Sequence, residues 1–163
     1  MEQAGVVLAI HLRSASGAPP RSTGEARAIV GHGLDGDYHG KRRSDTNRQL
    51  LLVDRRVLES LGFAHGALRE QLTVDFQGLD ALGSGTRLRV GGAELEVTGP
   101  CEPCEDIGRI NNVPDPDALR QRLLGRRGVL AKVVAITDAG RIRIGDPVHV
   151  LTEGTEPASA PMP

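Results

Sequence analysis

The chain is poor in aromatic residues, with no Trp, one Tyr and two Phe among its 163 residues. Domains that bind single-stranded nucleic acid stack bases on aromatic side chains, so this scarcity argues against that class. The 20 basic and 21 acidic residues nearly cancel and give no strong positive field for a polyanion. No apolar run approaches the roughly 20 residues that a membrane span requires. We therefore expect neither nucleic acid nor a membrane as partner.

The chain also has little cysteine and no long apolar segment near its start. Residues 6–10 form a run of only five apolar residues, whereas the apolar part of a signal peptide has roughly 7–15. We therefore expect a cytoplasmic protein. Its two cysteines, in a reducing compartment, suggest chemistry rather than a disulfide framework.

What the sequence does contain is a series of short apolar or alternating runs separated by glycine-rich turns. Two short helices are also predicted, one from Asp54 to Leu61 before Gly62, the other from Pro116 to Leu124 before Gly125. This pattern predicts a mainly antiparallel sheet or a partly closed β-barrel. We expect one domain over residues 1–152 and a disordered tail over 153–163. The predicted strands are 5–12, 26–30, 49–53, 71–74, both halves of 86–98, 128–137, 141–144 and 147–151.

The clearest local prediction is a hairpin over residues 86–98. Apolar and charged residues alternate on both sides of Gly91-Gly92, and two glycines suit a two-residue turn. In that register Arg89 lies opposite Glu94 and Arg87 opposite Glu96 on the same face.

Two cysteines follow this hairpin in the segment Gly99-Pro100-Cys101-Glu102-Pro103-Cys104. Three chemistries fit their spacing: a zinc site completed by His32 and His39, a redox dithiol, or a thiolate that binds a soft metal or carries sulfur. A pair of small buried thiols is the structural alternative.

Polar residues gather at three other places. A glycine-rich loop, 33–40, contains Asp37 and His39, which could bind a ligand or move protons. Arg48-Gln49 precedes one predicted strand, and Arg69-Glu70-Gln71 precedes another. At strand ends such residues either converge on a site or cap the sheet, and the sequence does not separate the two.

In this order, these motifs resemble a MOSC domain, the module named after the C-terminal part of molybdenum cofactor sulfurase. The resemblance spans roughly residues 5–151. It is carried by G-L-D-G-D-Y-H (33–39), Arg48-Gln49, E-Q-L (70–72), Gly78-Leu79, the hairpin (85–98), Pro103-Cys104, G-V-L-A-K-V (128–133) and G-R-I-R-I-G-D-P-V (140–148).

The resemblance implies a mixed or barrel-like sheet and a role linked to the molybdenum cofactor, a molybdopterin. It makes Cys104 the candidate molybdenum ligand or persulfide carrier, and Cys101 a second thiol that could resolve a persulfide on Cys104. Asp37, His39, Arg48 and Glu70 would support the site or contact substrate.

Arg48, Arg109 and Arg127 are candidates for the pterin phosphate, with Gln49, Glu70 and Gln71 beside them. Related stand-alone proteins reduce N-hydroxylated compounds with electrons from an external reductase, and others are thought to carry sulfur from a donor protein. A non-catalytic cofactor carrier and a zinc-stabilised structural module are the alternatives.

Overall fold

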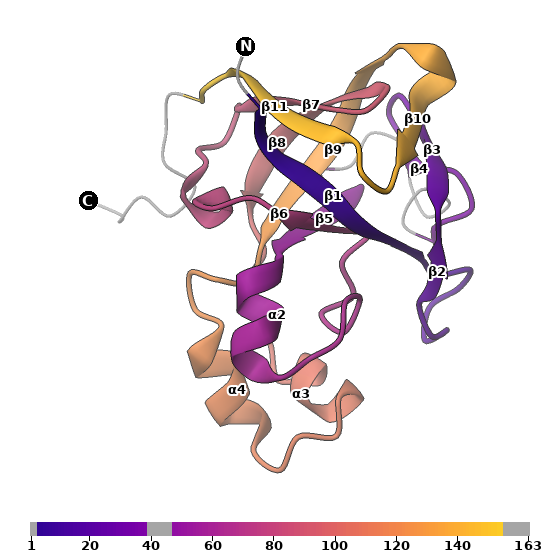
Figure 1. The fold of residues 1–163 in the computed structure, drawn as a ribbon. Helices are drawn as coiled ribbons and strands as arrows, with labels where there is room; N and C mark the ends of the chain where they lie inside the picture. Colours follow the sequence, from indigo (N-terminus) through magenta and orange to yellow (C-terminus); the bar gives the residue numbers. More distant parts are fainter. Residues whose placement is uncertain (1–2, 39–46, 155–163) are drawn as a thin grey trace.

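The computed structural model describes residues 3–38 and 47–154, and its main feature is a closed β-barrel (Figure 1). Seven strands follow one another around it in the order β1-β11-β7-β8-β9-β5-β6, and β6 pairs with β1 again. The strands are β1 (Gln3–Leu12), β5 (Leu50–Asp54), β6 (Leu72–Asp75), β7 (Arg87–Val90), β8 (Ala93–Pro100), β9 (Val129–Ile136) and β11 (Pro147–Thr152).

All neighbouring strands of the barrel are antiparallel except β5 and β6, which are parallel. The sheet is therefore mixed, and the prediction of a mainly β, barrel-like fold with a few short helices is confirmed. The barrel is closed rather than partly closed because β11 pairs with β1. The alternating pattern of each strand predicts a buried face, but it does not say which strands meet at the seam.

The predicted hairpin is confirmed in its register. Arg87 lies opposite Glu96 and Arg89 opposite Glu94 in the β7–β8 pair. Arg87 donates from Nη1 to Glu94 (3.0 Å) and from Nε to Glu96 (3.1 Å). The alternating apolar residues of both strands point into the barrel, where Leu88 and Leu95 are fully buried.

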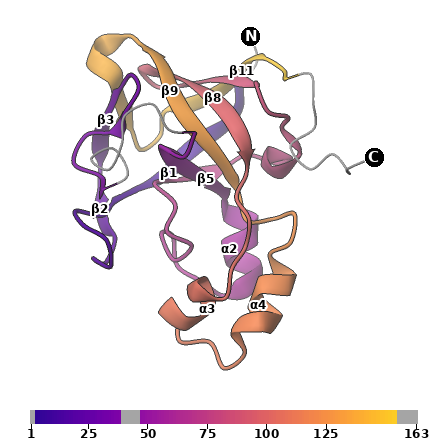
Figure 2. The ribbon, with the colours of Figure 1, turned by 180° about the vertical axis from the view of Figure 1, so that it is seen from behind.

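Three short helices lie together on one side of the barrel, below it in both views (Figures 1 and 2), and residues of all three share an apolar core with the outward-facing residues of β5. The helices are α2 (Arg55–Leu61), α3 (Asp106–Ile110) and α4 (Pro116–Arg122). Asp54 caps α2 by accepting from the backbone N–H of Arg56, and Asp115 caps α4 by accepting from that of Ala118. Gly62 ends α2 in the left-handed region, as predicted, whereas α4 ends at Arg122, before Gly125. None of the described helices is long and apolar enough to cross a membrane.

This arrangement gives two separate apolar cores, and β5 belongs to both. Leu50 and Leu52 pack into the barrel interior, while Leu51 and Val53 face the helices outside it. All five residues of β5 are buried for this reason. Cys101 also belongs to the outer core.

The remaining elements are short. They include two strands that the sequence does not predict, because Arg21–Thr23 and Gly33–Leu34 lack a clear alternating pattern. β2 extends the sheet beyond β1, and β3, β4 and β10 form a small sheet of their own. Their bounds are β2 (Arg21–Thr23), β3 (Glu25–Ile29), β4 (Gly33–Leu34), β10 (Arg141–Arg143) and the 3₁₀ turns η1 (Leu79–Ala81) and η2 (Asp138–Gly140). Of the tail predicted over 153–163, residues 155–163 lie outside the described residues.

Gly128 joins the helical layer to β9 and has a backbone that other residues rarely adopt. Its φ is +100°, and a Cβ there would overlap the carbonyl oxygen of Leu52. Gly125 has a φ of +73° with open space around it. We expect Gly128→Ala to lower the free energy of unfolding by about 3 kcal/mol and Gly125→Ala by about 1 kcal/mol, since only the first adds a clash to the backbone strain. Urea titration of both variants measures the difference, and equal losses would contradict it.

Candidate arginine pocket

A small pocket lies at the start of β5, beside β9 and the start of β6. Its volume is about 140 Å³. Four arginines from different parts of the chain line it, together with Cys101, and none of the described residues in its wall is acidic. The lining residues are Arg13, Arg48, Leu50, Leu51, Arg69, Gln71, Cys101, Arg127 and Leu130.

Three of these arginines have guanidinium nitrogens that are buried without a hydrogen-bond partner among the described residues. They are the Nε atoms of Arg13, Arg69 and Arg127, and Nη1 of Arg127. Arg13 is only 8 % exposed and Arg127 only 7 %. Burying an unpaired cation is costly, and native structures rarely leave such donors unsatisfied. A pocket built this way is suited to an oxyanion, which would accept from several guanidinium groups at once.

Burial and the neighbouring positive charge in the pocket affect the pKa of Arg13. Burial lowers this pKa below its ordinary value, and the nearby charge of Arg69 lowers it further. Asp37 and Tyr38 act in the opposite direction but do not cancel these effects. An anion placed between the guanidinium groups would relieve the repulsion between Arg13 and Arg69.

The two cysteines are both free thiols, but their surroundings differ. Cys101 is buried in the pocket wall, and its backbone N–H donates to the carbonyl oxygen of Gly128 (2.9 Å). Burial raises the pKa of the Cys101 thiol, although the charges of Arg127 and Arg48 pull it down. Cys104 is exposed, three residues further along the loop.

Two predicted site residues, Asp37 and Gln71, form a buried link at the pocket, whose wall includes Gln71. Gln71 donates from Nε2 to Asp37 (3.2 Å), and its Oε1 accepts from the backbone N–H of Leu51 (2.8 Å). Asp37 also accepts from the backbone N–H of Arg13 (3.0 Å). This link ties the start of β6 to β5 and to the end of β1, so it positions the backbone of Arg13.

Glu70 holds the loop that carries Arg69. Its carboxylate accepts from the backbone N–H groups of Gly66 (2.9 Å) and Leu68 (3.1 Å) and from the hydroxyl of Thr73 (2.7 Å). Arg69 itself has a φ of +63°, a strained value for a residue with a side chain. Three hydrogen bonds to one carboxylate thus fix the loop in the conformation that carries Arg69 into the pocket wall.

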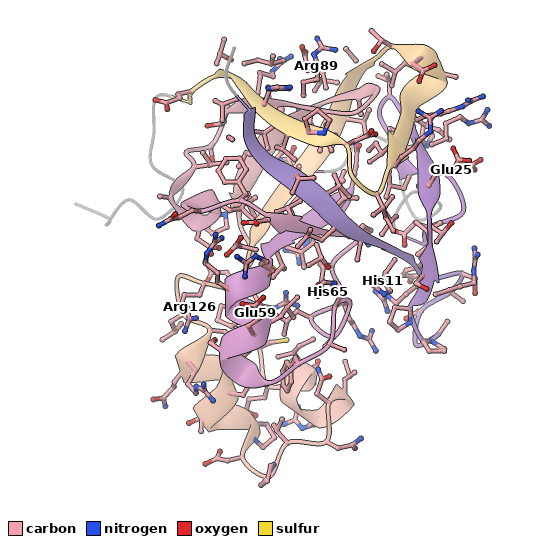
Figure 3. All side chains as sticks on the ribbon, viewed as in Figure 1. His11, Glu25, Glu59, His65, Arg89 and Arg126 are labelled. Carbon is pink, nitrogen blue, oxygen red and sulfur yellow. The ribbon has the colours of Figure 1, made fainter. Side chains whose placement is uncertain are left out.

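The same loop packs closely against β1. A Cβ on Gly66 would lie 2.8 Å from the ring of His11, and Gly66 has a φ of +89°. Figure 3 shows the labelled His11 and His65 near each other. Burial lowers the pKa of His11, the charge of Glu70 acts against this, and the charge of His65 lowers the pKa further.

The other predicted residues lie elsewhere. Gln49 is fully buried, and its Oε1 accepts from the backbone N–H of Val133 (2.9 Å), which links β5 to β9. Arg109 lies on the exposed side of α3 and pairs with Glu105 (2.9 Å) and Asp106 (2.8 Å), so it does not line the pocket. His39 lies outside the described residues.

The zinc alternative requires Cys101, Cys104, His32 and His39 to come together. Within residues 3–38 and 47–154, no three His, Cys, Asp or Glu side chains gather closely enough to hold one metal ion. That part of the chain includes three of the four ligands, so the structure does not assemble this site.

Sequence reasoning missed Arg13 and gave Arg69 no specific role. The signal that could have found them is the strong preference for Arg over Lys, since 18 of the 20 basic residues are Arg. Such an excess is also typical of GC-rich coding, so it does not indicate which arginines converge.

Solved structures with a similar fold include YuaD from Bacillus subtilis, at 18 % identity over 91 % of this chain and 97 % of that one, with a TM-score of 0.75. YiiM from Escherichia coli has 19 % identity over 97 % of this chain and 73 % of its own, with a TM-score of 0.70. YiiM from Geobacillus stearothermophilus has 18 % identity over 93 % and 77 %, with a TM-score of 0.69. At these identities the likeness shows the fold. A search of curated protein sequences finds no match.

The sequence itself gives a further match that covers more than half of the chain. The family model of the MOSC domain matches residues 39–149. This range includes both cysteines and three of the four pocket arginines, Arg48, Arg69 and Arg127. Together with the closed mixed barrel, this match shows that the chain belongs to the MOSC domain family.

Proposed function

We propose that this protein binds the molybdenum cofactor in the arginine pocket. The observation that carries the proposal is the set of buried, unpartnered guanidinium nitrogens of Arg13, Arg69 and Arg127 in one wall with a cysteine. Family membership adds the general association of MOSC domains with this cofactor.

The residues fit the two demands of the cofactor. Its pterin carries a phosphate, and guanidinium groups bind phosphate through paired, charge-assisted hydrogen bonds. Molybdenum in this cofactor takes soft sulfur ligands, and a thiolate is such a ligand. Arg13, Arg69 and Arg127 would hold the phosphate, and the Cys101–Cys104 segment would supply the sulfur.

We assign the ligand role, or the role of persulfide carrier, to Cys104. Its sulfur is exposed, so a metal centre or a partner protein can reach it. Burial keeps Cys101 protonated by raising its pKa, and a protonated thiol is a poor ligand. Cys101 then forms part of the pocket wall.

When bound, the cofactor supplies two-electron oxygen-atom chemistry at molybdenum, and the chain binds and orients it. The protein is then a small oxidoreductase for N-hydroxylated compounds that takes electrons from an external reductase. The exposure of Cys104 favours a second candidate, a sulfur carrier that receives sulfur from a donor protein. A cofactor carrier without turnover would use the same pocket, and absence of turnover with any supplied reductant would distinguish it.

Removing one pocket arginine tests the oxyanion site directly. We expect Arg127→Gln to raise the free energy of unfolding by about 1 kcal/mol in phosphate-free buffer, because a buried unpaired charge is removed. The same variant should lose most of the increase in melting temperature that millimolar phosphate gives the wild type. Thermal melting with and without phosphate at constant ionic strength measures both effects.

Arg109→Gln is the matched control, because Arg109 is exposed and paired outside the pocket. It should keep the full response to phosphate. Equal responses of wild type, Arg127→Gln and Arg109→Gln would contradict the proposed oxyanion site.

Elemental analysis distinguishes the roles of the two thiols. After expression in a host that makes the cofactor, we expect Cys104→Ser to lose at least nine-tenths of the wild-type molybdenum. Cys101→Ser should keep most of it, because that thiol stays protonated. A greater loss in Cys101→Ser would reverse the assignment, and wild-type molybdenum in both variants would remove cysteine from the site.

The pH dependence of alkylation tests the difference in environment. Because burial raises the pKa of Cys101, its thiolate forms only above the ordinary range of thiols. Iodoacetamide at pH 7 should therefore modify Cys104 first, and modification of Cys101 should increase steeply only as the pH rises beyond about 9. Peptide mass spectrometry follows each site separately, and equal rates at pH 7 would contradict the assignment.

A further inference from the structure

Arg127 lies in the turn between α4 and β9, and the residue that follows it is hydrogen-bonded at both of its backbone groups. The N–H of Gly128 donates to Oδ1 of Asp80 (2.9 Å). The carbonyl oxygen of Gly128 accepts from the backbone N–H of Cys101 (2.9 Å). Gly128 therefore connects Asp80 to two residues of the pocket wall, to Arg127 along the chain and to Cys101 through a hydrogen bond.

The hydrogen bond to Asp80 acts on the peptide group that follows Arg127. That peptide joins Arg127 to Gly128, so its orientation sets the direction in which the Arg127 side chain leaves the backbone. Glycine has more accessible backbone conformations than other residues, and Gly128 is held at a φ of +100°. A carboxylate that accepts from its N–H selects one of these conformations. Asp80 thereby acts on Arg127 without lining the pocket itself.

Asp80 is held firmly because the residue before it is anchored in the barrel. It belongs to η1, between β6 and β7, where Leu79 is only 1 % exposed and packs in the barrel core. Gly78 precedes this turn in the left-handed region, with a φ of +88°. Asp80 therefore ties the turn that carries Arg127 to a fixed point of the barrel.

The carboxylate of Asp80 is half-buried, which opposes its charge. Burial raises the pKa of Asp80, and the charge of Asp54 acts in the same direction. The hydrogen bond from Gly128 and the charge of Arg126, which is labelled in Figure 3, lower this pKa. The N–H of Gly128 thus offsets part of the cost of burying the carboxylate, so breaking the hydrogen bond is unfavourable for both partners.

A similar arrangement occurs at the two other arginines that have buried guanidinium nitrogens without a partner among the described residues. Asp37 accepts from the N–H of Arg13, and Glu70 accepts from the N–H of Leu68, directly before Arg69. In each case a carboxylate binds the backbone at the arginine or beside it. Such support keeps an arginine in place and leaves these nitrogens available for a ligand.

We infer that Asp80 is a positioning residue of the arginine pocket, which fixes Arg127 and Cys101 in the pocket wall by holding Gly128. This inference rests on the proposed function, in which Arg127 binds the phosphate of the ligand. Without the hydrogen bond to Asp80, the backbone beside both residues is free to turn. Phosphate binding then weakens, and the Cys101 thiol becomes accessible.

Asp80→Ala tests the inference with two independent readouts. Calorimetry with inorganic phosphate at constant ionic strength measures the pocket, and iodoacetamide with peptide mass spectrometry measures access to Cys101. We expect Asp80→Ala to bind phosphate about tenfold more weakly than the wild type, which is the effect of one lost hydrogen bond. At one fixed pH, the rate of Cys101 alkylation relative to that of Cys104 should rise about tenfold, because the segment opens more often.

Asp80→Asn separates the hydrogen bond from the charge. It removes the same negative charge as Asp80→Ala but keeps an oxygen that can accept from Gly128, so both readouts should return to within about twofold of the wild type. Asp115→Ala is the matched control, because Asp115 also accepts from one backbone N–H in the helical layer, that of Ala118 (3.1 Å). It loses an equal charge and a hydrogen bond of the same kind, and it should leave both readouts unchanged.

Thermal melting shows which variants are folded. If Asp80→Ala does not fold, Asp80→Ser takes its place, because the serine oxygen lies one bond closer to the backbone and does not reach Gly128. Unchanged phosphate affinity or unchanged Cys101 alkylation in this variant would overturn the inference. Equal effects in Asp115→Ala, or no recovery in Asp80→Asn, would overturn it as well.

The wild type separates this inference from the proposed function. If it binds no phosphate, the arginine pocket is not an oxyanion site and the proposed function fails. The alkylation of Cys101 alone then decides whether Asp80 positions the pocket wall.

Discussion

The parallel pairing of β5 and β6 is the constraint on which the rest of the molecule depends. Two parallel neighbours cannot be joined by a tight turn, so the chain must leave the sheet and return to the same end. Here it returns through α2 and the loop before β6. That crossover covers the outer face of β5 and creates the second apolar core. It also places Arg69 and Gln71 in the wall of the arginine pocket, beside Arg48, Leu50 and Leu51.

The arginine pocket is a place where the fold accepts a local energetic cost. Arg13 and Arg127 are buried with guanidinium nitrogens that find no partner among the residues described. The surrounding backbone is held by other means, namely the carboxylates of Asp37 and Glu70 and the amide of Gln71. The polar groups around the pocket thus satisfy one another, and the cationic groups in its wall remain available for a ligand.

The sequence predicts best where structure is decided by neighbours along the chain. The 86–98 hairpin follows from a two-glycine turn and from charges that match across it, and the cap of α2 follows from Asp54. The two-residue strand β4 gives no such pattern, because it pairs only through the distant contact with β3.

The site is harder to predict because its parts are far apart. Arg13 and Arg127 line one pocket only when β1, β6, β5 and β9 have assembled side by side, and no local pattern contains that information. Polar residues at strand ends are equally ambiguous. Glu70 and Gln71 hold neighbouring backbone segments in place through buried hydrogen bonds. In the sequence, a residue with this role looks the same as a residue that binds a ligand. Cysteine position was more informative, since the segment after the hairpin does reach the pocket through Cys101.

The closure of the barrel has a consequence for how the protein folds. The first strand, β1, pairs with the last, β11, through contacts such as Gln3 with His149. Until β11 has been synthesised, β1 and β7 each present an open edge whose backbone groups can pair with another chain. The seam also joins residues at nearly the greatest separation that the described chain allows, which slows folding by raising the entropic cost of the final contact. A nascent chain is therefore vulnerable to aggregation for most of its synthesis, and its last strand removes that risk.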